Sequence, residues 1–184
     1  MNPAQYSFGD AGGIPNNPHF PMLVYSNAID PLAGDPAIAF ETLFSRNGWD
    51  KGWRNGIFDY AHYHSNTHEV LGIAVGSAKV RFGGTGGAVL TVTAGNAVLI
   101  PAGTGHERIS CTSDLLVIGF YPPGPAPDLI GETGSDLEKM RSNINSVGRP
   151  STDPVTGAIG GLLNLWNRSP QVSTSLGNPT NTEF

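Results

Sequence analysis

Residues 56–76 read GIFDYAHYHSNTHEVLGIAVG, and this is the most informative part of the sequence. His62 and His64 are two positions apart, so on a strand both side chains point to the same face. The polar residues 65–67 form a turn signal, after which a second strand begins near Glu69. The stretch therefore predicts two adjacent strands that bring two imidazoles and one carboxylate together.

A second stretch contributes a fourth side chain that can bind a metal. Residues 95–106 read GNAVLIPAGTGH, which predicts a turn, an apolar strand, a second turn and then a histidine. A divalent ion needs several nitrogen or oxygen ligands that converge from a rigid support, and adjacent strands provide one. The predicted metal ligands, called the ligand set below, are His62, His64, Glu69 and His106.

The composition favours one small domain built of strands. The chain has 184 residues, 39% of them hydrophobic, which is enough for one packed core and short for two. The 25 glycines and 15 prolines, with few long helical patterns, favour short strands joined by tight turns, as in a sandwich or barrel.

The charge and the chain start argue against several function classes. The net charge is −5 and the ten Lys and Arg residues are scattered, so we expect no nucleic-acid partner. No basic stretch leading into an apolar run follows Met1, and no apolar run is long enough to span a membrane, so we expect a cytoplasmic protein. Cys111 is the single cysteine, which excludes an internal disulfide, and we interpret it as a small buried apolar residue.

Several further elements are expected along the chain. The glycine- and proline-rich residues 1–22 predict an extended arm that packs as an edge strand. Alternating apolar residues predict a strand at 38–44, with a helix as the competing interpretation. Further strands are predicted at residues 70–75, 79–82, 88–92, 97–100 and 115–121.

The C-terminal part has a different character. The proline-rich residues 121–127 cannot continue a sheet and should lead away from the barrel. Residues 135–138 form a capping box, which predicts an amphipathic helix over about 136–147 that packs on the outside. The polar stretch after Trp166 should be weakly ordered.

The two metal-ligand stretches together resemble the cupin motifs. The first fits the pattern of Gly, five residues, His-x-His, four residues, Glu, six residues and Gly, and the second fits its companion pattern. The matching residues are Gly56, His62, His64, Glu69 and Gly76, then Gly95, Pro101, Gly103 and His106. Ser110 stands where the family commonly has Asn. Residues 14–18 and 23–25 also resemble a group of single-domain, YjlB-like cupins.

This resemblance implies an all-β fold, the cupin-type double-stranded β-helix or jelly-roll barrel, with an N-terminal extended arm and a C-terminal helix. It implies one domain over residues 1–184, with the barrel core at about 37–121, the arm at 1–36 and the extension at 122–184. The metal would lie inside the barrel, held by the ligand set. Such barrels often pair through an outer sheet, so we predict a homodimer.

The ligand set indicates several possible functions. Three imidazoles and one carboxylate suit Fe, Mn, Ni, Co or Zn. By the resemblance, we expect an enzyme that acts on a small organic molecule, with oxygenase-type chemistry as the first hypothesis and non-redox isomerisation or decarboxylation as the second. A non-catalytic ligand-binding module is a third. A purely structural barrel, whose cavity Phe58, Tyr60 and Phe120 fill, is a fourth.

Three residues are candidates for catalysis beside the metal. Tyr60 is in phase with His62 and should line the cavity, either as substrate contact or as core filling. Arg108 is two positions after His106 and would share its face, where it would bind an anionic substrate group if it is buried. His68 precedes Glu69 and should face the opposite way, with an outer or supporting role.

Overall fold

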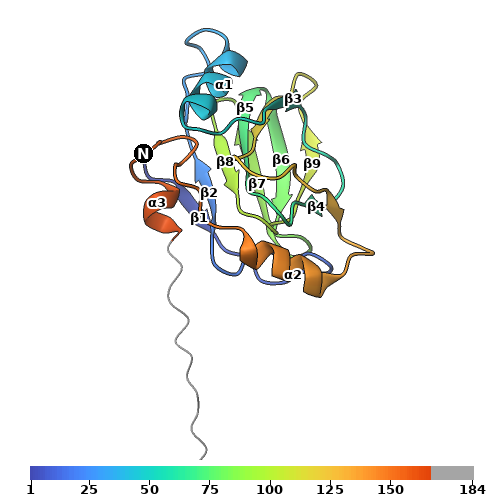
Figure 1. Ribbon diagram of the computed structural model, residues 1–184. Helices are drawn as coiled ribbons and strands as arrows, with labels where there is room; N and C mark the ends of the chain where they lie inside the picture. The colour runs from blue at the N-terminus through green and yellow to red at the C-terminus, as the bar shows by residue number, and fades with distance from the viewer. Residues whose placement is uncertain (167–184) are drawn as a thin grey trace, which may run out of the picture.

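Two antiparallel sheets face each other in the computed structural model, which describes residues 1–166 (Figure 1). The six-stranded sheet has the order β1-β2-β8-β5-β10-β3, and the five-stranded sheet has the order β11-β4-β9-β6-β7. The strands are β1 (Ala4–Tyr6), β2 (Met22–Tyr25), β3 (Trp53–Asn55), β4 (His62–Tyr63), β5 (Glu69–Val75), β6 (Ser77–Phe82), β7 (Ala88–Thr93), β8 (Ala97–Ile100), β9 (His106–Cys111), β10 (Leu116–Phe120) and β11 (Ile130–Gly131). The predicted all-β jelly roll is confirmed, and the strands predicted between residues 70 and 121 are present.

The central strands of the six-stranded sheet are buried on both faces. Along β5, Leu71 and Ile73 point between the two sheets, where they join one hydrophobic core cluster. Val70 and Ala74 point to the other face and join a second cluster with residues of the helix α1. Because β5 is covered on both sides, its sequence is a continuous apolar run rather than an alternating one.

The helix α1 (Pro36–Arg46) occupies the segment that was predicted to be a strand, so that prediction is wrong. Asp35 caps the helix by accepting hydrogen bonds from the backbone N–H groups of Ala37 and Ile38, and Pro36 suits the first turn. The apolar residues that alternate in sequence also recur at helical spacing. The cap and the buried face of the helix therefore decide against the strand.

Phe40 fixes α1 to the sheet. Its ring lies directly on Gly72 of β5, so that a Cβ atom at Gly72 would come within 2.5 Å of the ring. Phe40 is fully buried, whereas Ile38 on the outer side of the same helix is 53% exposed. The close approach of helix and strand therefore depends on a large side chain packed against a glycine.

The N-terminal arm is part of the barrel wall. β2 pairs with β8 inside the six-stranded sheet, and β1 pairs with β2 as the edge strand, as predicted. Residues 1–36, which were predicted to be an arm, thus supply two strands to the barrel. The barrel core had been predicted at residues 37–121 only.

The C-terminal extension folds back onto the barrel. The helix α2 (Leu137–Ser146), capped by Asp136, matches the predicted helix and lies close to β4 in Figure 1, where Met140 packs on Tyr63. A short helix, α3 (Leu162–Leu165), follows. Among the described residues, none of these helices has the length and apolarity that crossing a membrane requires. The stretch predicted to be weakly ordered, after Trp166, lies outside the described residues.

Phe40→Ala should destabilise the protein strongly. The variant removes a fully buried ring and leaves a cavity over Gly72, so we expect the free energy of unfolding to fall by about 3–5 kcal/mol. Ile38→Ala on the exposed side of α1 is the control and should change it by no more than about 0.5 kcal/mol. Urea unfolding followed by circular dichroism measures both, and equal effects would contradict the packing described.

Candidate metal centre

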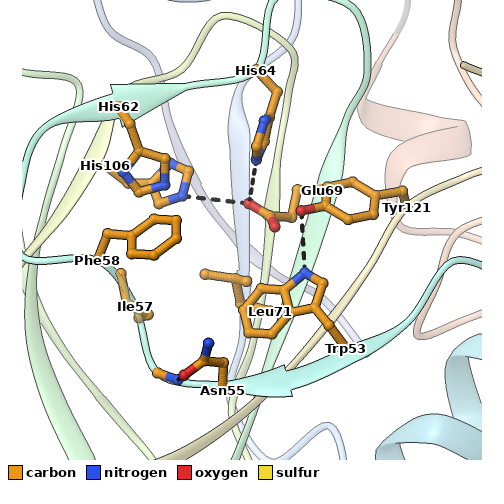
Figure 2. A pocket seen from close by; sticks show the side chains of 11 residues that line it. Trp53, Asn55, Ile57, Phe58, His62, His64, Glu69, Leu71, His106 and Tyr121 are labelled. Atoms are coloured by element: carbon orange, nitrogen blue, oxygen red, sulfur yellow. Dashed lines mark hydrogen bonds and ion pairs between the residues drawn. The ribbon is translucent and has the colours of Figure 1, made fainter. Parts of the chain in front are cut away.

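A cavity of about 230 Å³ opens between the two sheets, and all four residues of the ligand set line it (Figure 2). His62 on β4 is directly paired with His106 on β9 in the five-stranded sheet. His64 follows β4, and Glu69 begins β5 in the opposite sheet. The predicted turn after His64 therefore carries the chain from one sheet to the other, so that the carboxylate faces the histidines.

Each histidine of the ligand set is oriented by a backbone carbonyl. The Nδ1 atom of His62 lies 3.0 Å from the Tyr60 oxygen, and that of His106 lies 3.4 Å from the Thr104 oxygen. The Nδ1 atom of His64 contacts the Asp128 oxygen. Since a carbonyl only accepts, Nδ1 carries the proton and Nε2 keeps its lone pair. This is the arrangement by which proteins orient metal-binding histidines.

The Nε2 atoms of two histidines converge on one oxygen of Glu69. The distances to Glu69 Oε2 are 3.5 Å from His64 and 3.4 Å from His106, as the dashed lines in Figure 2 show. Glu69 Oε2 is buried and makes no hydrogen bond. Two nitrogen lone pairs that face a carboxylate oxygen repel it unless a cation lies between them, either a proton or a metal ion.

The electrostatics of the site favour a bound cation. Burial raises the pKa of Glu69, but hydrogen bonds and positive charge from His106 and His64 outweigh burial and lower that pKa, so the carboxylate is ionised when a proton or another cation lies at their Nε2 atoms. Burial and the neighbouring His106 lower the pKa of His62 to about 4, so this imidazole is neutral. Burial disfavours charge on His64 as well, yet Glu69 raises its pKa overall.

The donor atoms fit a divalent ion in type and number, and two of the spacings also fit. Two donors bound to one ion at about 2.0–2.2 Å lie about 3–3.5 Å apart, which matches the two contacts with Glu69. His62 packs on His106, with ring centroids 4.2 Å apart. Within residues 1–166, no group of three or more His, Cys, Asp or Glu side chains closes on one point at metal-binding geometry. Binding an ion would therefore require the four side chains to close further.

Asp128 holds the turn that carries His64, a contribution that sequence reasoning missed. Its carboxylate accepts hydrogen bonds from the backbone N–H of Ser65, at 2.7 Å, and from the Ser65 hydroxyl. The side-chain oxygen of Asn66 in turn accepts from the backbone N–H of Asp128 at 3.0 Å. The proline-rich segment before Asp128 leads the chain back to the site, and no local pattern in the sequence indicated this.

Tyr121 and Trp53 also line the cavity and were missed as site residues. Trp53 Nε1 donates a hydrogen bond to the Tyr121 hydroxyl at 3.1 Å, and the Tyr121 ring packs edge-on against His64. Burial and the nearby Glu69 carboxylate raise the pKa of Tyr121, so its phenol stays protonated. The phenol is thus a fixed neutral donor beside Glu69. Tyr121 is the last residue of the strand predicted at 115–121, and this position was the feature of the sequence that could have indicated a site residue.

His68 lies outside the cavity, so the structure gives no support to its candidacy for catalysis. Both ring nitrogens are engaged: Nδ1 accepts from the Ala102 N–H at 2.9 Å, and Nε2 contacts the Gly148 oxygen at 3.1 Å. The ring packs against both Phe20 and Trp166, which are stacked on each other. His68 therefore joins the barrel to the C-terminal extension, because its side chain faces away from that of Glu69 as expected.

The rim of the cavity carries two stacked aromatic rings. Phe58 lines the cavity, and Tyr60 stacks on it at 5.0 Å between ring centroids but does not line the cavity itself. Both are nearly half exposed. Phe120 lies on the outer face of the six-stranded sheet in contact with Phe44. The hypothesis of a cavity closed by Phe58, Tyr60 and Phe120 is therefore wrong.

Arg108 does not point into the cavity, which removes the argument for an anionic substrate group. Its Nε donates to the Ile57 oxygen at 2.9 Å, and its guanidinium lies 3.5 Å from Asp59. Residues 55–58 thus separate Arg108 from the ligand set. Cys111, interpreted as buried, is exposed and lies 3.2 Å from the Arg108 guanidinium, so that interpretation was wrong.

Comparison with known proteins identifies the family. The chain is 41% identical over 161 residues to the uncharacterised protein YjlB of Bacillus subtilis, covering 88% of this chain and 94% of that protein. The chain belongs to the YjlB family. No family model matches the sequence.

Several solved structures are similar to this chain at low identity and low TM-score. Acireductone dioxygenase from Bacillus anthracis, with a cadmium ion in its active centre, is 14% identical, with 58% of this chain and 82% of that chain covered and a TM-score of 0.42. TDP-fucose-3,4-ketoisomerase WlaRA from Campylobacter jejuni is 12% identical, covering 76% and 93%, with a TM-score of 0.37. Oxalate decarboxylase from Bacillus subtilis is 17% identical, covering 58% and 26%, with a TM-score of 0.31. These values are too low to carry an argument about this chain.

His68 should make stability depend on pH. Burial lowers its pKa to about 4, against 6.5 when unfolded. Between these values the unfolded chain binds the proton and the folded chain does not, so stability falls as the pH drops from 6.5 towards 4. The slope from this group reaches about 1.4 kcal/mol per pH unit. Urea unfolding across this window should show a shallower dependence for His68→Gln, and an unchanged slope would contradict this account.

Proposed function

We propose that this protein is a metal-dependent cupin enzyme that acts on a small organic molecule, with a divalent ion held by the ligand set. One observation carries the proposal: the Nε2 atoms of His64 and His106 converge on a buried Glu69 oxygen that has no hydrogen-bond partner. Fe, Mn, Ni, Co and Zn all suit three imidazoles and one carboxylate.

A bound divalent ion would supply Lewis acidity towards an oxygen-bearing substrate group, or redox chemistry with dioxygen if the ion is redox-active. The protein's own residues prepare the site for this. Carbonyl groups fix the three imidazoles, and the apolar walls formed by Leu71 and Ile57 limit the water that can reach Glu69. Tyr121 offers a neutral phenol proton beside the carboxylate.

Oxygenase-type chemistry is the first candidate reaction, and it rests on the cupin resemblance. Non-redox isomerisation or decarboxylation is the second, and Tyr121 favours it, because a protonated phenol in the pocket is suited to proton transfer with substrate. A non-catalytic module that retains a small ligand is the alternative outside enzymes. Turnover that is equal under air and under nitrogen would exclude the oxygenase, and the absence of turnover with every suitable metal would favour the binding module.

His64→Ala should abolish metal retention. Removing one imidazole leaves three ligands, and because even the loss of a ligand's hydrogen-bond partner weakens binding about 10–100-fold, we expect a weakening of at least about 100-fold. His19→Ala, at an exposed histidine outside the cavity, is the matched control and should keep its metal. Elemental analysis of protein purified without chelators measures both, and full metal content in His64→Ala would contradict the proposal.

The homodimer remains a prediction that rests on the cupin resemblance and on the exposed sheet edges. We expect light scattering to give the mass of two chains, and a monomer mass would contradict it.

A further inference from the structure

The walls of the cavity are apolar beyond the ligand set. Trp53, Ile57, Phe58 and Leu71 line it, and Asn55 at the mouth contributes a neutral amide. None of the described residues that line the cavity is a lysine or an arginine. A second charged group on a bound molecule would therefore lie against apolar walls without a partner, which is costly.

The cations near the cavity are already engaged elsewhere. The Arg108 guanidinium lies behind residues 55–58, where it contacts the Ile57 oxygen, Asp59 and Cys111. Arg54, next to Trp53 on β3, forms a two-point ion pair with Glu41 on α1. Neither is free to bind a second anionic group of a ligand.

The size of the cavity sets a further limit. Its volume of about 230 Å³ lies below the roughly 300–1,000 Å³ typical of pockets for drug-sized ligands. The cavity therefore suits a compact molecule, such as one ring with a single head group, rather than a nucleotide or an oligosaccharide.

A fixed hydrogen-bond donor, the phenol of Tyr121, lies beside the position that a head group bound near Glu69 would occupy. Trp53 Nε1 donates to the Tyr121 oxygen at 3.1 Å, and the phenol proton of Tyr121 faces Glu69, so it can be donated to a head group once a metal ion binds the Glu69 carboxylate. Trp53 is fixed in turn, because its ring lies directly on Gly119, the residue opposite it on β10. A Cβ atom at Gly119 would lie only 2.0 Å from the indole ring. The donor is thus held by a large ring packed on a glycine.

We propose that the cavity binds a compact molecule with one oxygen-bearing head group and an uncharged, mostly apolar remainder, with Tyr121 donating to the head group and Trp53 and Phe58 packing on the remainder. This inference rests on the proposed function, since the head group would be held at the metal centre. It excludes molecules with a second charged group, such as dicarboxylates, as preferred ligands.

Three carboxylates that differ in one feature each test the proposal. Acetate has the head group alone, 4-methylbenzoate adds an apolar ring, and terephthalate replaces the methyl group with a second carboxylate. Each is titrated into the cobalt-loaded protein, and the visible absorption of Co(II) reports binding at the metal. We expect 4-methylbenzoate to bind at least about tenfold more tightly than acetate, from apolar burial, and at least about tenfold more tightly than terephthalate.

Variants separate the roles of the wall and the donor. Phe58→Ala, at the exposed mouth, should weaken 4-methylbenzoate by about threefold or more and leave acetate unchanged. Tyr121→Phe should weaken all three carboxylates by about tenfold, because a hydrogen bond to a charged group is lost. Tyr63→Phe is the matched control, since that phenol points away from the cavity towards Ser135, and it should change nothing.

The outcomes distinguish this inference from the proposed function. Failure of the wild-type protein to retain Co(II) would overturn both. Three other outcomes, each with Co(II) retained, would overturn the inference about the ligand but not the metal centre. These are binding of terephthalate as tight as that of 4-methylbenzoate, no binding of any of the three carboxylates, and unchanged affinities in Tyr121→Phe.

Discussion

The buried carboxylate of Glu69 is the constraint on which the rest of the site depends. Taking an ionised carboxylate out of water is costly unless positive charge lies beside it. Here the neighbours are imidazoles whose Nδ1 protons are already donated to backbone carbonyls, so they turn lone pairs towards the carboxylate. A cation satisfies all of these groups at once. The fold holds them in this arrangement because Glu69 begins a central strand of one sheet while His62 and His106 are paired in the other.

The surrounding structure supports this arrangement from outside the barrel. Asp128, in the C-terminal extension, orients His64 through its carbonyl and fixes the turn after it through its carboxylate. His68 joins the same extension to the turn that follows β8. The extension therefore contributes to the site, and a barrel truncated after β10 would lose the contacts that hold His64 in place.

The sequence predicted the parts of the site that depend on local spacing. The alternation of His62 and His64 and the turn before Glu69 are local patterns, and the structure places these side chains in one cavity as expected. Contributions that depend on tertiary contacts were missed. Tyr121 and Trp53 meet across the β3–β10 pair, and Arg108 is drawn away by the carbonyl of Ile57. The strand predicted at residues 38–44 failed because its alternation also fits a helical face, and the Asp35 cap decided between them.

The most direct measurement is a crystal structure of the metal-loaded protein with anomalous data collected at the absorption edge of the metal. The account predicts one anomalous peak between the two sheets, bound by Nε2 of His62, His64 and His106 and by the Glu69 carboxylate. A peak elsewhere in the chain, or coordination through Nδ1 of any of these histidines, would contradict it.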